Sequence, residues 1–178
     1  MKKVKILDKT FELYIEESEI LRRITILGNE LNEEFSDKSP LLISVLNGAF
    51  MFTSDLMKTL NFPCEVSFVK LASYDGISST GAVKTILGLE LNIQNRDVIL
   101  IEDIIDTGNT LAAFIPILKE KNPKSIKLIS LISKPKALKH PIHIDRTCFE
   151  IPNDFIVGYG LDYDGYGRNL RDIYVITN

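Results

Sequence analysis

Three short apolar runs do most to constrain the fold of this chain. They are LLISVL at 41–46, DVILIEDI at 97–104 and SIKLISLIS at 125–133. Each is too short to span a membrane and too uniformly apolar for a strand with one solvated face, so each is typical of a strand buried on both faces. Helical patterns follow the first two runs, at 49–60 and from the turn after Asp106 through Lys121. Buried strands that alternate with helices predict an α/β fold with a mainly parallel central sheet flanked by helices.

Other segments add detail to this plan. Apolar residues share one helical face between Glu17 and Phe35, which predicts a helix there. Between Cys64 and Leu91, two alternating stretches flank the polar YDGISSTG, which predicts an antiparallel arm with a mobile loop at its tip. Pro116 lies inside the last helical pattern, where it predicts a kink or a later helix start.

Composition excludes several classes of protein. The chain has 178 residues, enough for one ordinary domain with its own core, and no linker is evident. Its net charge is -3 and it has no run of five like charges, which argues against binding to long nucleic acid or to an anionic membrane. No stretch approaches the ~18 apolar residues of a membrane span. Cys64 and Cys148 are its two cysteines and indicate packing roles in a reducing compartment, so we expect a soluble, cytoplasmic protein.

The second apolar run ends in charged residues that indicate a site. Glu102 and Asp103 stand where a central parallel strand ends, which is where such sheets bind ligands. The stretch Asp106-Thr107-Gly108-Asn109-Thr110 then leads into a helix. A glycine turn, amide N–H groups without intrahelical partners and threonine hydroxyls together predict a phosphate-binding turn. It is not a Walker A loop, because the GxxxxGK[ST] spacing is absent. Ordinary helix caps and solvated carboxylates are the alternative, and they fit so apolar a strand less well.

The acidic pair and the turn together resemble the phosphoribosyl pyrophosphate signature of the type I phosphoribosyltransferases, and Asp106 matches their hypoxanthine-guanine branch. The resemblance implies that Glu102 and Asp103 face the ribose hydroxyls and that residues 106–110 hold the 5'-phosphate. It extends over nearly the whole chain. It therefore implies that 1–178 form a single domain, with a small hood built from roughly 1–15 and the C-terminal segment.

Three further loops agree with this resemblance. Leu46-Asn47-Gly48 matches the family's first loop, whose often cis peptide binds pyrophosphate, although taken alone it could equally be a simple turn between strand and helix. Ser73 and Tyr74 match the flexible lid over the reacting centre, where a generic surface loop is the alternative. Lys134 follows a buried strand and matches the lysine that hydrogen-bonds the purine 6-oxo group, where a solvated lysine is the alternative.

The C-terminal stretch IPNDFIVGYGLDYDGYGRNLRDIYVI is also closely similar to the family. The resemblance implies that Phe155 stacks on the purine and that Ile156 presents backbone groups to the purine edge. Asp162 would bind magnesium near the purine, and Arg168 would hold pyrophosphate. Glu102 and Asp103 would also bind the metal.

The implied activity is purine salvage that depends on Mg²⁺. A 5-phosphoribosyl group would pass from phosphoribosyl pyrophosphate to hypoxanthine and/or guanine, giving IMP or GMP and pyrophosphate, with Asp106 as general base and with Ser73 and Tyr74 in the lid. The family implies a homodimer or homotetramer. A xanthine-guanine or other phosphoribosyltransferase stays open, as does a regulator that binds RNA or DNA, which would need a basic face. His140 and His143 indicate a surface loop rather than a zinc site, because no cysteine or carboxylate cluster accompanies them at zinc-like spacing.

Overall fold

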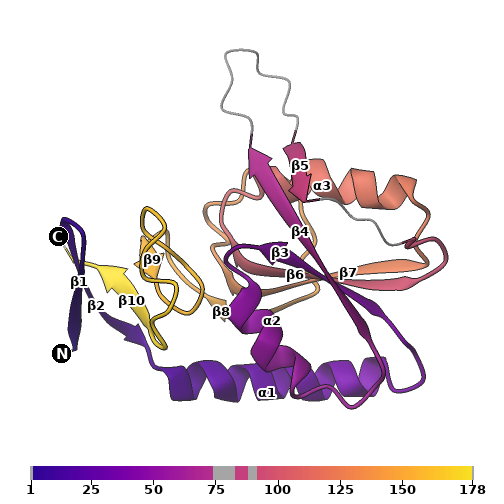
Figure 1. The fold of residues 1–178 in the computed structure, drawn as a ribbon, viewed down its shortest axis with the longest axis horizontal. Coiled ribbons are helices and arrows are strands. Elements are labelled where there is room, and N and C mark those ends of the chain that lie inside the picture. Colours follow the sequence, from indigo (N-terminus) through magenta and orange to yellow (C-terminus); the bar gives the residue numbers. More distant parts are fainter. Residues whose placement is uncertain (1, 74–82, 88–91, 178) are drawn as a thin grey trace.

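The computed structural model describes residues 2–73, 83–87 and 92–177, and these build two sheets (Figure 1). The larger sheet has the strand order β5-β4-β3-β6-β7-β8, and the smaller has the order β1-β2-β10-β9. The strands are β1 (Lys3–Ile6), β2 (Lys9–Ile15), β3 (Leu41–Leu46), β4 (Glu65–Ser73), β5 (Val83–Leu87), β6 (Asp97–Ile105), β7 (Ser125–Ser133), β8 (Arg146–Glu150), β9 (Ile156–Val157) and β10 (Ile173–Ile176). The helices are α1 (Glu17–Glu34), α2 (Phe50–Met57) and α3 (Asn109–Glu120).

The larger sheet confirms the predicted α/β architecture. Strand β3 pairs in parallel with β4 and β6, and β7 pairs in parallel with β6 and β8. Only β5 runs antiparallel among the described strands of this sheet, through its pairing with β4. Strand β4 therefore belongs both to the parallel sheet and to the predicted antiparallel arm. The arm is thus continuous with the central sheet. The arm's tip, 74–82, lies outside the described residues.

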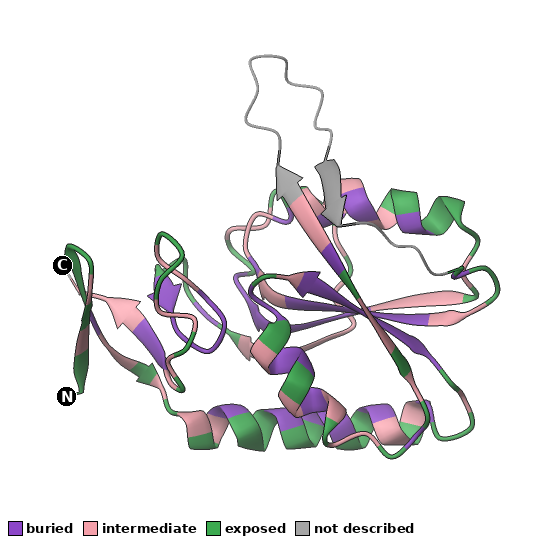
Figure 2. Cartoon of the chain, viewed as in Figure 1, coloured by how far each residue is buried: buried purple, intermediate pink, exposed green. Residues whose placement is uncertain are grey.

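Helices cover both faces of the sheet, as the apolar strands require (Figure 2). Alternate residues of each strand face opposite sides: Leu42 joins the cluster under α1 and α2, whereas Leu41 and Ile43 join the cluster under α3. Burial on both faces explains why the central strands β3 and β6 are largely apolar before their carboxyl ends.

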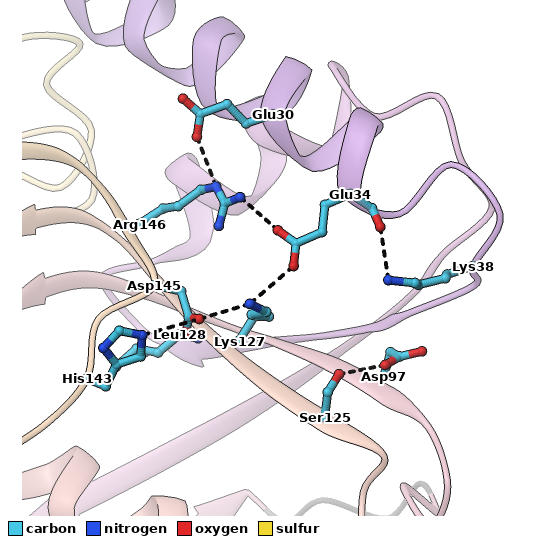
Figure 3. Close-up of polar contacts among 10 residues, drawn as sticks. All are labelled: Glu30, Glu34, Lys38, Asp97, Ser125, Lys127, Leu128, His143, Asp145 and Arg146. Carbon is cyan, nitrogen blue, oxygen red and sulfur yellow. Dashed lines mark hydrogen bonds and ion pairs between the residues drawn. The ribbon is translucent and has the colours of Figure 1, made fainter.

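Charged residues add to the packing of α1 near the start of β7 and β8 (Figure 3). Arg146 contacts Glu30 at 2.9 Å and Glu34 at 2.8 Å, and Lys127 lies 3.2 Å from Glu34 and from Asp145. The pairs join the last turns of α1 to the amino ends of β7 and β8. The carboxyl ends of the parallel strands lie at the opposite edge of the sheet.

The smaller sheet is the predicted hood. Antiparallel pairing joins β2 to β1 and β10, and β10 to β9, so it draws the two ends of the chain together (Figure 1). Phe11, Val157 and Tyr174 form its buried centre. The hood is thus made of the N-terminal strands and the C-terminal segment, as expected.

Two predictions about helices need correction. Helix α2 ends at Met57 rather than at residue 60, and α3 begins at Asn109 and continues through Pro116 to Glu120, so the late start is wrong. Proline removes one hydrogen bond from a helix. However, side chains before and after Pro116 in the chain bury α3 against the sheet, namely Leu111, Phe114 and Leu118. The alternative, a kink at Pro116, stays a prediction. No helix among the described residues is long and apolar enough to cross a membrane.

Candidate active site

The acidic pair lies at the carboxyl end of β6, where the sequence predicts a ligand site. Glu102 is buried, and its Oε1 accepts a 3.3 Å hydrogen bond from the amide of Asp103. The amide of Ile104 donates to Asp103 Oδ1 at 2.8 Å. Burial raises the pKa of both carboxyl groups; the charge of Asp103 adds to the effect on Glu102, whereas hydrogen bonds and the charge of Arg168 oppose it at Asp103. A buried carboxyl next to a half-buried one is costly without partners, so this edge is suited to a cation or to hydroxyl donors.

The predicted phosphate turn directly follows this strand. Gly108 has φ +76°, a left-handed conformation that favours glycine, and a Cβ there would lie 2.6 Å from Ile142 Cδ1. The amide of Ala112 donates to the Gly108 carbonyl at 2.9 Å as α3 begins, and the first amides of a helix have no acceptor within it. Residues 104–111, with Val45, Leu71 and Glu102, line a pocket of about 230 Å³. The turn therefore has the amides and the space that a phosphate group needs.

Lys134 and Asp106 form a contact that the sequence reasoning missed. Lys134 follows β7 and is 5% exposed, and its Nζ lies 3.1 Å from Asp106 Oδ2. Its amide also donates to the Ile105 carbonyl at 2.9 Å. The signal was present in the sequence, because both residues follow buried strands by one position, and neighbouring parallel strands end at the same edge. The predicted purine lysine and the predicted base thus share one corner of the site.

The loop after β3 packs tightly against the acidic pair. The Leu46–Asn47 peptide is cis. A Cβ added to Gly48 would lie 1.5 Å from Asp103 Oδ2, and one added to Gly160 would lie 2.1 Å from the Gly48 carbonyl oxygen. Gly48 is therefore enclosed between a carboxylate of the central sheet and the backbone of the C-terminal segment.

Arg168 reaches the same place from the C-terminal segment. Its Nη1 donates to the Gly160 carbonyl at 2.8 Å, and its Nη2 lies 2.7 Å from Asp162 Oδ1. Asp162 also accepts a 2.7 Å hydrogen bond from the amide of Gly165. The structure thus brings together the predicted pyrophosphate residues Asn47, Gly48 and Arg168, next to Asp103.

Phe155 and Ile156 stand at the start of the C-terminal segment. The ring of Phe155 is 45% exposed, and its centroid lies 5.9 Å from that of Tyr163 in an edge-on arrangement. Ile156 is buried in β9, where it pairs with Val175. A partly exposed aromatic ring of this kind can stack on a planar base.

Other predicted residues are not brought together. Among the described residues no three histidine, cysteine or acidic side chains gather around one point, so Asp162, Glu102 and Asp103 do not form a preformed three-ligand set. Ser73 is the last residue of β4, and Tyr74 lies outside the described residues, so the lid stays a prediction. His140 and His143 are exposed, as expected, but His140 Nε2 lies 2.9 Å from Asn109 Oδ1 in the predicted phosphate turn.

Comparison with known proteins decides the family. The model of the phosphoribosyl transferase domain matches residues 14–164. The chain belongs to the phosphoribosyltransferase family. It is 41% identical over 166 residues to the hypoxanthine-guanine phosphoribosyltransferase of Bacillus subtilis, covering 93% of this chain and 92% of that phosphoribosyltransferase. The predicted resemblance to the hypoxanthine-guanine branch is thereby confirmed.

A solved phosphoribosyltransferase structure gives the same result for the fold. The hypoxanthine phosphoribosyltransferase of Staphylococcus aureus superposes with a TM-score of 0.89 at 35% identity, over 93% of this chain and 91% of that one. The bifunctional protein TilS/HprT of Listeria innocua is 40% identical over 166 residues, which are 93% of this chain. This chain spans 26% of the length of that bifunctional relative.

Proposed function

We propose that this phosphoribosyltransferase transfers the 5-phosphoribosyl group of phosphoribosyl pyrophosphate to hypoxanthine and/or guanine, giving IMP or GMP and pyrophosphate. One observation carries the proposal: Lys134 lies 3.1 Å from Asp106 at the head of the phosphate turn. This arrangement would put a purine-binding cation and a proton acceptor on one side of the sugar. The relatives named as hypoxanthine-guanine phosphoribosyltransferases support it.

The proposed reaction exchanges two bonds at C1' of the ribose. The bond to pyrophosphate breaks while purine N9 bonds to C1', and the purine N7 proton passes to Asp106 as general base. The sugar gains positive charge as pyrophosphate leaves, and Glu102 and Asp103 would orient its hydroxyls close to that charge. Arg168 and the Gly48 loop would stabilise the charge that develops on pyrophosphate. Lys134 would leave Asp106 and donate a hydrogen bond to the purine 6-oxo group instead.

The residues present fit the expected Mg²⁺. Glu102, Asp103 and Asp162 offer the oxygen ligands that this ion prefers, and of the two on β6 Glu102 is buried and Asp103 half-buried. Magnesium is commonly bound by one or two carboxylates together with substrate phosphates, which agrees with a site that has no preformed three-ligand cluster among its described residues. When bound, the ion would supply Lewis acidity at the leaving group.

Two assignments accompany this function. The thiols of Cys64 and Cys148 are free, which is the usual state in a reducing compartment and supports a cytoplasmic location. We also expect a single domain over 1–178 that assembles into a homodimer or homotetramer, which light scattering on the pure protein measures.

A direct assay tests the function. The protein is incubated with phosphoribosyl pyrophosphate and Mg²⁺ plus hypoxanthine, guanine, xanthine or adenine, and nucleotide formation is followed. We expect IMP, GMP or both. Product from xanthine together with guanine, and none from hypoxanthine, would indicate the xanthine-guanine type. Absence of product from all four bases, with a salt-dependent shift of RNA or DNA, would indicate the regulator instead.

A further inference from the structure

A buried tyrosine hydroxyl joins the C-terminal segment to α2. Tyr159 is 1% exposed, and its hydroxyl donates a 2.5 Å hydrogen bond to Asp55 Oδ2. The Tyr159 ring belongs to the same buried cluster as Phe52 and Leu56 of α2. Burial, followed by the contact with Asp55, raises the pKa of Tyr159, so the hydroxyl remains a donor throughout the physiological pH range. The contact therefore links two segments that lie 104 residues apart in the chain.

The backbone around Tyr159 needs external support. Gly158, Tyr159 and Gly160 have φ values of +105°, +49° and +98°. A tyrosine in the left-handed region is disfavoured and persists only where its surroundings hold it there. The Tyr159 amide donates to the Leu170 carbonyl at 2.8 Å, and the hydroxyl bond to Asp55 holds the other end of the residue.

Residues next to Tyr159 belong to the predicted pyrophosphate site. The α-carbon of Gly160 lies so close to the Gly48 carbonyl that no side chain would fit between them. The Gly160 carbonyl accepts the hydrogen bond from Arg168 Nη1. A shift of Tyr159 would therefore move Gly160, which contacts both Gly48 and Arg168.

We propose that Tyr159 and Asp55 are positioning residues for the pyrophosphate half of the site: their hydrogen bond holds Gly160 and Arg168 against the Gly48 loop. The inference rests on the proposed function. The phosphate turn and Lys134 follow β6 and β7, away from this hydrogen bond. The predicted purine residues Phe155 and Ile156 share a segment with Tyr159, but backbone pairing with β10 holds them independently of Asp55. Loss of the hydrogen bond should therefore affect pyrophosphate and leave nucleotide binding unchanged.

Kinetics of the reverse reaction test the proposal. IMP and GMP formation by the wild-type protein is measured first, and the absence of both products would overturn the proposed function itself. For Tyr159→Phe we expect the KM of pyrophosphate, with IMP as co-substrate, to rise about tenfold, less than the ~10²-fold that a misplacement of about 1 Å can cost. The Kd of IMP without pyrophosphate should stay within twofold of wild type.

Asp55 provides the second half of the experiment. Asp55→Ala should raise the KM of pyrophosphate as much as Tyr159→Phe does, and the double variant should be no worse than either single one, because all three lose the same contact. Asp55→Asn keeps an acceptor oxygen and should recover most of the wild-type value. Asp55 is a partly exposed helix residue, so we expect its variants to fold. If Tyr159→Phe fails to fold, the KM of pyrophosphate is measured on the Asp55 variants instead.

A matched control separates positioning from stability. Tyr174 is 2% exposed and its hydroxyl donates to Asp172 at 3.1 Å, but both residues lie in the C-terminal part of the chain and do not contact α2 through this bond. Tyr174→Phe should leave the KM of pyrophosphate unchanged. The proposal is overturned if Tyr159→Phe lowers the melting temperature while the KM stays within twofold, or if the KM of pyrophosphate and the Kd of IMP rise by the same factor.

Discussion

Gly48→Ala is the substitution whose effect follows most directly from the geometry. The added Cβ would lie 1.5 Å from Asp103 Oδ2 and 2.4 Å from its Cγ. Non-bonded carbon and oxygen atoms seldom approach closer than about 3.4 Å, so the carboxyl group, the loop or both must move by about 2 Å. A misplacement of about 1 Å can cost 10²-fold in rate, so kcat/KM for IMP formation should fall by at least about 10²-fold. The strain of overpacking should also lower the free energy of unfolding by about 1–3 kcal/mol.

The assay compares IMP formation with thermal melting for two glycine variants. Gly28→Ala is the matched control, because its Cβ would lie 1.9 Å from Thr59 Oγ1 where α1 packs, in a contact that includes none of the predicted site residues. We expect Gly28→Ala to alter the melting temperature and leave kcat/KM within about threefold of wild type. Folded Gly48→Ala protein with wild-type kcat/KM would refute the reasoning, since it would show that the position of Asp103 against the loop does not matter.

Three further outcomes are expected. Asp106→Asn should retain IMP binding while kcat falls about 10²-fold or more, and unchanged turnover would exclude Asp106 as the base. Lys134→Ala should raise the KM of hypoxanthine far more than that of phosphoribosyl pyrophosphate, and equal losses would contradict its assignment to the purine. Lys2 and an amide of α1 hold the pKa of Asp172 below its usual value, so the carboxylate's contribution to stability is present above its unfolded pKa and lost as pH falls through the folded pKa. The melting temperature of wild type should therefore exceed that of Asp172→Asn at pH 7, with the difference shrinking below about pH 4, and a difference independent of pH would contradict this reasoning.

Much of the candidate site could be predicted because it lies on consecutive elements. Glu102, Asp103 and the turn at 106–110 are neighbours in sequence, and their chemistry follows from a buried strand that ends in carboxylates. The Lys134–Asp106 contact was also within reach, since both residues follow adjacent strands of one sheet. The continuous helix through Pro116 could not be predicted, because the packing of α3 on the sheet offsets the tendency of proline to interrupt a helix.

The sequence by itself determined the α/β class, the layers and the turn between β6 and α3 that we predict to bind phosphate, because the periodicity of apolar residues and the needs of a helix N-terminus are local properties. Only the tertiary structure decided how Gly48 lies between Asp103 and Gly160, and how Tyr159 reaches Asp55. Those contacts join residues about 55 to 112 positions apart, and a distance in space between such residues depends on how every intervening element packs. The proposed pyrophosphate half of the site is therefore a property of the folded chain, whereas the proposed phosphate half can be predicted from one segment of the sequence.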